Sequence, residues 1–347
     1  MKTITKGKNM NNLKKIGLTA LAGSLAAISA NAAEMTVNGA TVLTYTSADA
    51  TETTGNAYGM KTNLGFTASG EVNGYTVSYM QTSKDQFAGM SSARLSVDMG
   101  DLGTLAFDQG SGSGLSTIDD KTPTAAEEIW DGLDAAATGE ANGRVGTAGS
   151  SGVFNYIKSI YGVNLNAAYR NGAGSTSADG GNGGSAKDNG TAWDLALTAG
   201  DDVTNVAGLS MGAGYGEAGN GDQTGSNEGD DEHMTAFANY SYGPATFGAQ
   251  LSHLGINGKS SGSTNEYVQA WGLAVNINEN LSLSYGEREI EYKKAGATHI
   301  TEEGEGIAVA YTMGSIKIAG NRNEVANNGG TANSTDQMTE IAVSFAF

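Results

Sequence analysis

The sequence feature that most constrains the fold is an alternation of large apolar residues with small or polar ones. In the final segment, residues 339–347, one parity is small or polar and the other carries Ile341, Val343, Phe345 and Phe347. Successive side chains of a strand point to opposite faces, so each such run predicts a β-strand with one apolar face. The pattern returns at 93–99, 161–169, 271–277, 281–285 and 307–313. Runs of about ten residues suit tilted strands that cross a bilayer.

The connections between these runs alternate in length. Short links lie at 73–74, 101–102, 159–160, 200–207, 243–244, 278–280 and 314–315. Longer polar segments separate them, at 47–57, 83–90, 109–151, 171–190, 217–232, 256–265, 294–305 and 323–336. This alternation predicts an all-β fold, a 16-stranded antiparallel transmembrane β-barrel with short periplasmic turns and long extracellular loops. A soluble β-sandwich is the alternative, but a sandwich does not require loop lengths to alternate.

Residues 1–32 have the pattern of a secretory signal peptide. Several lysines precede a weakly apolar run from Ile16 to Ala30, and Ala30-Asn31-Ala32 offers the small residues that signal peptidase accepts. We expect cleavage after Ala32 and a mature barrel over 33–347. Translation starts at Met1 or at Met10, and the sequence leaves both open. No later stretch approaches the length of apolar run that a transmembrane helix needs.

Composition excludes several kinds of chemistry. The chain has no Cys, which removes disulfides, thiolate metal sites and a Cys nucleophile. Its formal charge of -18 argues against nucleic-acid binding, which needs clustered Lys and Arg. The three histidines, His233, His253 and His299, lack metal-ligand spacing, and no nucleophile motif is present. We therefore expect that the protein is not an enzyme and that it binds no cofactor, no metal and no nucleic acid.

Three further features accompany the predicted strands: Ala30-Asn31-Ala32 followed by Glu34, the turn Gly100-Asp101-Leu102-Gly103-Thr104-Leu105, and the terminal Phe347. Together they resemble the general porins of the Gram-negative outer membrane. The resemblance implies a homotrimer of water-filled barrels in outer-membrane lipid that admit small hydrophilic solutes and ions by passive diffusion. It also implies that the third long loop folds inward. The C-terminal set resembles the signal that the outer-membrane assembly machinery reads, namely Ile341, Val343, Phe345 and Phe347.

The third long loop, 109–151, is the longest, and loops of this size in compact folds are usually functional. It is also rich in acidic residues. We expect a short helical turn at 125–133, with Ile129, Trp130 and Leu133 pinning the loop to the wall and the carboxylates facing the channel. A solvated loop outside the mouth is the alternative. The candidate acidic residues of the constriction are Asp108, Asp119, Asp120, Glu127, Glu128, Asp131 and Asp134.

Strand parity places a set of basic residues on the lumen face: Lys61, Arg94, Arg170, Arg288 and Lys317. Facing charges of opposite sign would create a transverse field in the pore. Many porins carry an Arg where this chain has Asp108, so we predict that cations and neutral solutes pass more readily than anions. A substrate-specific channel and a non-conducting surface β-barrel or adhesin are the alternatives.

Overall fold

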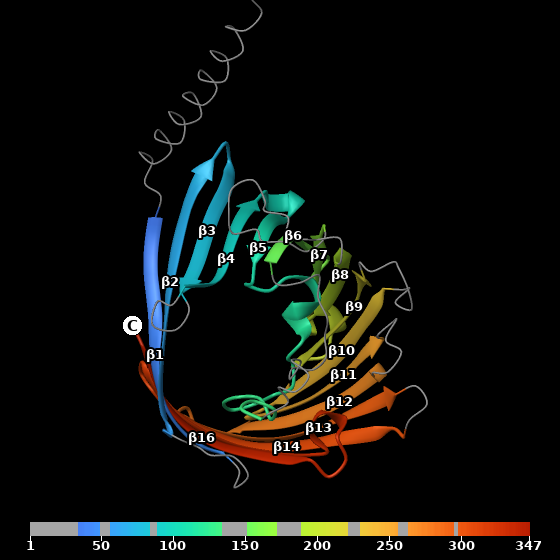
Figure 1. The fold of residues 1–347 in the computed structure, drawn as a ribbon. Helices are drawn as coiled ribbons and strands as arrows, with labels where there is room; N and C mark the ends of the chain where they lie inside the picture. Colours follow the sequence, from blue (N-terminus) through green and yellow to red (C-terminus); the bar gives the residue numbers. More distant parts are fainter. Residues whose placement is uncertain are drawn as a thin grey trace, which may run out of the picture.

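Sixteen strands follow one another around a closed barrel (Figure 1). The computed structural model describes residues 34–48, 56–83, 89–133, 151–171, 189–220, 230–255, 263–294 and 298–347. Each strand pairs antiparallel with its neighbours in the chain, and β1 pairs with β16 to close the ring. The predicted all-β barrel of sixteen antiparallel strands is therefore confirmed. The signal-peptide prediction lies outside the described residues.

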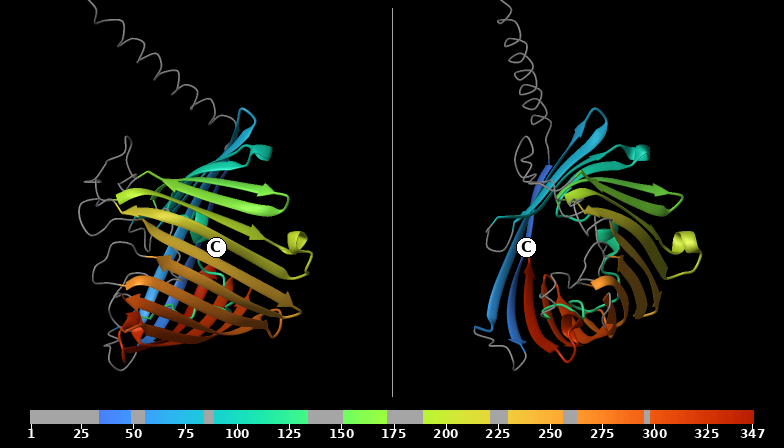
Figure 2. Two further views of the ribbon diagram at one scale, coloured as in Figure 1. Left: turned by 90° about the vertical axis from the view of Figure 1, so that its right-hand side faces the viewer. Right: turned by 45° about the vertical axis from the view of Figure 1, so that its right-hand side comes forward.

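The strands lie tilted around the wall (Figure 2). Their bounds are β1 (Glu34–Ala48), β2 (Tyr58–Val72), β3 (Tyr75–Ser83), β4 (Met90–Asp98), β5 (Thr104–Gln109), β6 (Ser151–Ile160), β7 (Val163–Arg170), β8 (Asn189–Ala199), β9 (Leu209–Asn220), β10 (Asp231–Tyr242), β11 (Ala245–Gly255), β12 (Ser263–Asn276), β13 (Leu281–Lys294), β14 (Ile300–Met313), β15 (Ile316–Ala326) and β16 (Thr335–Ala346). β14 and β15 extend further than the sequence predicted, because the acidic residues near their ends continue the alternation.

The helical pieces within the described ranges are short. They are α2 (Asp201–Thr204) and the 3₁₀ helices η2 (Gly100–Leu102), η3 (Gly114–Ile118) and η5 (Asn328–Gly330). None of the helices in these ranges is long and apolar enough to cross a membrane.

One predicted turn was misplaced. The link between β6 and β7 is Tyr161-Gly162, not residues 159–160, and both turn residues have positive φ. A two-residue hairpin turn of this kind needs positive φ at both central positions. The β-branched Ile160 resists that conformation, so the strand continues through it and the turn falls on the next pair. Tyr161 is consequently a fully exposed turn residue and does not begin a strand.

The outward face of the barrel is apolar over most of its circumference. Exposed large side chains include aromatic residues near the short turns, such as Tyr75 and Tyr242, and others nearer the long connections, such as Tyr45, Trp193 and Tyr267. Two aromatic levels bordering an apolar belt are the pattern that a barrel presents to a bilayer.

The segment that follows β5 runs inside the ring of strands (Figure 1). We call its described part, residues 110–133, the inner loop. Its helix is η3, and the helical turn expected at 125–133 is shortened to two hydrogen-bonded turns, in which Asp131 N donates to the Glu128 carbonyl and Leu133 N donates to the Trp130 carbonyl. Ala125 N, at the start of this stretch, donates to Ser284 Oγ on the wall at 2.9 Å.

Candidate functional site

Polar side chains of the wall hold the inner loop strand by strand. Gly114 N donates to Asn166 on β7, and Leu115 N donates to Asp194 on β8. Further bonds come from Asn239 on β10, Gln250 on β11, Ser284 on β13 and Asn323 on β15. Buried backbone groups are costly when unpaired, so this series of partners determines the course of the loop. The loop therefore follows the inner wall from β7 to β15.

Glycines on the wall make room for the loop. A Cβ at Gly214 would lie 2.4 Å from a Leu115 carbon, and one at Gly272 would lie 2.6 Å from the Pro123 carbonyl oxygen. A Cβ at Gly306 would lie 2.9 Å from Ile129. Side chains at these positions would push the loop into the lumen. The high glycine content of the chain thus has a partial explanation in the close approach of loop and wall.

Apolar side chains anchor the loop at both ends of its course. Leu115 and Ile118 pack with Ala196 and Phe237, and Leu133 packs with Val325 and Met338. Trp130 is also buried, so the predicted anchoring by Trp130 and Leu133 agrees with the structure. Sequence reasoning missed Leu115 and Ile118, although they are the large apolar residues of the Gly- and Ser-rich stretch that opens the loop.

A cavity of about 540 Å³ lies between the inner loop and the wall of β1, β2, β15 and β16. Glu127 and Asp131 line it from the loop. The charged residues that line it from the wall are Lys61, Lys317 and Glu340. The structure thus brings together two predicted acidic residues and two predicted basic residues. Glu340 was missed, although its parity opposite Ile341 places it inward.

The loop carboxyls hold their protons more tightly than free carboxyls do. Burial raises the pKa of Glu127, and the carboxyls of Asp131 and Glu128 raise it further, while Lys317 and Lys61 oppose the shift. Burial and the neighbouring Asp120 raise the pKa of Glu128 to about 7.

Asp119 and Asp120 also have raised pKa values, and burial is the main cause for both. The interaction between the Asp120 and Glu128 carboxyls lowers the pKa of Asp120 and raises that of Glu128. Glu128, with its pKa raised to about 7, therefore changes its charge within the neutral pH range.

Two predicted pore residues are buried, and their assignment to the open pore is corrected here. Asp108 is 1% exposed and accepts a bond from Ser113 Oγ at 2.8 Å, so it caps the start of the inner loop. Arg288 is 2% exposed and forms an ion pair with Glu302. Parity had placed both side chains inward correctly, but the inner loop covers this part of the wall.

The remaining predicted residues lie away from the cavity. Arg94 supports the start of the inner loop by donating to the Gly112 carbonyl at 2.9 Å and to Asn155. Asp119 and Asp120 lie on the loop near Gln250 of β11, and Arg170 ends β7. Asp134 lies outside the described residues.

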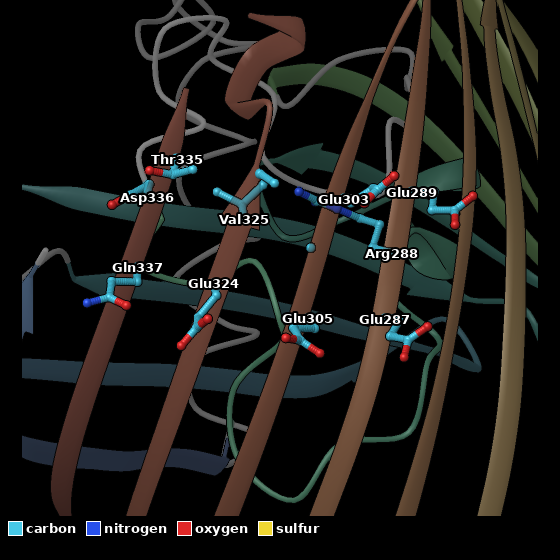
Figure 3. A pocket seen from close by; sticks show the side chains of 12 residues that line it. Glu287, Arg288, Glu289, Glu303, Glu305, Glu324, Val325, Thr335, Asp336 and Gln337 are labelled. Atoms are coloured by element: carbon cyan, nitrogen blue, oxygen red, sulfur yellow. The ribbon is translucent and has the colours of Figure 1, made fainter. Parts of the chain in front are cut away.

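A second hollow, of about 460 Å³, lies over β13 to β16 (Figure 3). Figure 3 shows carboxylates on adjacent strands around it, namely Glu287, Glu289, Glu303, Glu305 and Glu324. Glu287 shares the outward parity of Tyr285 and accepts a bond from its hydroxyl at 2.8 Å. We call these five residues the outer glutamates. Charges here are costly in hydrocarbon, so this part of the outer face requires water or polar headgroups. Sequence reasoning did not single them out.

The architecture described above, a closed barrel of sixteen antiparallel strands, is the fold of solved outer-membrane porins. A porin structure is 14% identical, with a TM-score of 0.64, and the match covers 90% of this chain and 100% of that one. An anion-selective porin from Comamonas acidovorans is 12% identical, with a TM-score of 0.64 and coverage of 91% and 100%.

A loop-deletion variant of the outer-membrane protein OmpT of Vibrio cholerae is 13% identical, with a TM-score of 0.66 and coverage of 91% and 100%. No family model matches the chain, and no curated protein matches it by sequence. At this level of identity the likeness establishes the fold.

Proposed function

We propose that the protein is an outer-membrane porin, a water-filled channel through which small hydrophilic solutes and ions diffuse. The observation that carries the proposal is the charged cavity between the inner loop and the wall, inside a barrel with the porin fold. Barrels of sixteen strands leave an aqueous interior, and an inward loop narrows it without filling it. In this function the side chains attract or repel ions, and no covalent chemistry is required of them.

The charge balance of the site supports a preference for cations. Glu127, Asp131 and Glu340 line the cavity against Lys61 and Lys317. Asp108 and Arg288, which are buried, do not alter this balance. Rings of charged side chains select ions by sign, so the excess of carboxylates favours cations. An anion-selective porin has a similar fold, so the sign of the preference is set by the side chains of the pore and not by the fold.

The outer face of β1 to β5 supports a homotrimer. In the described part of these strands the outward positions carry no charged residue, and they include Met60, Phe66 and Leu95. Neighbouring small residues such as Gly39 and Thr41 permit close packing against a second barrel. We assign the subunit contact to this side.

The C-terminal strand supports recognition by the assembly machinery. Ile341, Phe345 and Phe347 are exposed on the outward face, and they share its parity with Val343. Phe347 also closes the barrel, since its N–H and carbonyl bond to Gly39 at 3.0 and 2.9 Å. Before β16 pairs with β1, the aromatic end of β16 is available to the assembly machinery.

The test is planar-bilayer recording with refolded protein, residues 33–347, across a KCl gradient. We expect stepwise currents and a reversal potential on the cation side. The double variant Glu127→Gln/Asp131→Asn should lower the potassium-to-chloride permeability ratio by about fivefold, corresponding to about 1 kcal/mol for charges near the ion path.

The matched control for that double variant is Glu303→Gln, which removes a carboxylate from the outer face. Silence from a folded barrel would contradict the channel, and a chloride-side reversal potential would contradict the cation preference.

A further inference from the structure

A buried ion pair lies in the wall behind the inner loop. Nη2 of Arg288 on β13 donates to Oε1 of Glu302 on β14 at 2.7 Å, and the two side chains are 2% and 1% exposed. Removing two opposite charges from water is costly, and the pair alone is weak evidence for stability. Its other contacts indicate what it does.

Glu302 connects the ion pair to the outer link between β15 and β16, residues 327–334. Its second oxygen, Oε2, accepts a bond from Gly329 N at 2.8 Å and one from the Tyr292 hydroxyl at 3.1 Å. Gly330 packs against the Tyr292 ring so closely that a Cβ there would lie 2.8 Å from it. One buried carboxylate thus holds the outer link against β13.

Arg288 connects the same pair to the inner loop. Its guanidinium carbon lies 4.9 Å from the centroid of the Trp130 ring, within the range of a cation–π contact. Asn323 Nδ2 donates to the carbonyls of Glu128 and Asp131, at 3.0 and 2.9 Å, and so holds the backbone on both sides of Trp130.

The pore-lining carboxylates belong to the same short stretch of loop. Glu127 precedes Trp130 by three residues, and Asp131 follows it directly. Between them Ile129 fits against Gly306, which has no side chain. The positions of both carboxylates therefore depend on where Trp130 is held.

We propose that Trp130, Arg288 and Glu302 are positioning residues for the constriction and that they join it mechanically to the outer link 327–334. This inference rests on the proposed channel function. It means that a change in the outer link reaches the pore carboxylates through Glu302, Arg288 and Trp130 without touching a permeating ion.

Two variants test the positioning role in bilayers. Trp130→Leu removes the aromatic face, and Glu302→Gln keeps the shape of the side chain but removes its charge. Each should lower the potassium-to-chloride permeability ratio by about twofold, equivalent to about 0.4 kcal/mol. The matched control is Glu303→Gln, the next residue on β14 with its side chain outward, and it should behave as wild type. Wild-type ratios and conductance in both variants would overturn the proposal.

Trp130 fluorescence supplies a readout that does not depend on conduction. In a Trp193→Phe/Trp271→Phe background Trp130 is the one remaining tryptophan. Glu302→Gln and Gly330→Ala should both increase its quenching by acrylamide, whereas Glu303→Gln and Thr331→Ala should not. Unchanged quenching in the first two variants, with native circular dichroism, would overturn the mechanical connection. A silent but folded wild-type barrel would refute the channel function, and the quenching experiment would still decide whether the anchor exists.

Discussion

The wall of β1 to β5 and the wall of β13 to β15 differ on both of their faces. On β2 the inward residues Lys61 and Asn63 are exposed in the lumen, whereas on β13 the inward residue Arg288 is buried against Trp130 of the inner loop. On the outward face it is β13 to β15 that expose charged side chains. The described outward positions of β1 to β5 are uncharged, and β13 to β15 carry the outer glutamates.

This difference indicates what each side contacts. Glutamates at the outer ends of β13 to β15 need water or polar headgroups. These strand ends therefore lie at the level of the membrane surface, outside the hydrocarbon. A side uncharged over its full described height is suited to contact with another apolar surface along that height. The open part of the lumen along β1 and β2 therefore lies on the side that we assign to the subunit contact, whereas the inner loop follows the wall from β7 to β15.

The largest expected effect comes from placing a charge on the uncharged side. Thr41→Lys should dissociate the proposed trimer in detergent, because an unpaired lysine buried between two apolar barrel surfaces loses its hydration, whereas in the separated barrel it can reach water. Native mass spectrometry in detergent measures the oligomeric state. Gln269→Lys, on the outward face of β12 next to Glu289, is the control and should leave the oligomer intact. A trimer that survives Thr41→Lys would place the contact elsewhere.

Adding a methyl group to the wall where the inner loop packs against it should have the next largest effect. In Gly272→Ala the new Cβ meets the Pro123 carbonyl oxygen at 2.6 Å, and overpacking of this kind typically costs about 1–3 kcal/mol. We expect a lower thermal midpoint and an altered single-channel conductance.

Gly320→Ala is the control for this substitution, because its Cβ would have no neighbour closer than 3.6 Å. Equal conductance and equal midpoints in Gly272→Ala and Gly320→Ala would show that the loop is not held against β12.

Comparison of these two sides also shows what the sequence could and could not predict. Alternation and loop length predicted the barrel and the inward parity of Lys61 and Lys317, and composition identified Glu127 and Asp131. Parity gives the face of a strand but does not reveal what covers that face. For that reason Asp108 and Arg288 were assigned to open water, although the inner loop covers them.

The outer glutamates were missed for a related reason. Their strands continue beyond the apolar belt, and the sequence alone shows no boundary between strand and loop where apolar residues give way to Glu at the same parity. Tyr161 was misplaced because a tyrosine rarely adopts positive φ, and the hairpin geometry outweighs that preference.

A smaller effect should follow from pH on the loop-covered side. Glu128, with a pKa raised to about 7 by burial and by Asp120, is neutral below that pH and negative above it. The potassium-to-chloride permeability ratio should therefore rise between pH 6 and pH 8, and reversal potentials recorded at several pH values measure it. Glu128→Gln should reduce this rise, whereas an unchanged pH profile in that variant would assign the titration to another group.

The smallest effect is expected among the outer glutamates. Glu289 and Glu303 are directly opposite each other in the β13–β14 pairing, and like charges in that relation are destabilising by about 0.2–1 kcal/mol. Glu289→Lys turns the repulsion into an attraction, so it should raise the thermal midpoint more than Glu289→Gln does. Salt screens exposed charges, so the gain should shrink as ionic strength increases. Calorimetry at low and high salt measures both trends, and a gain independent of salt would mean that the two carboxylates do not repel each other across the strands.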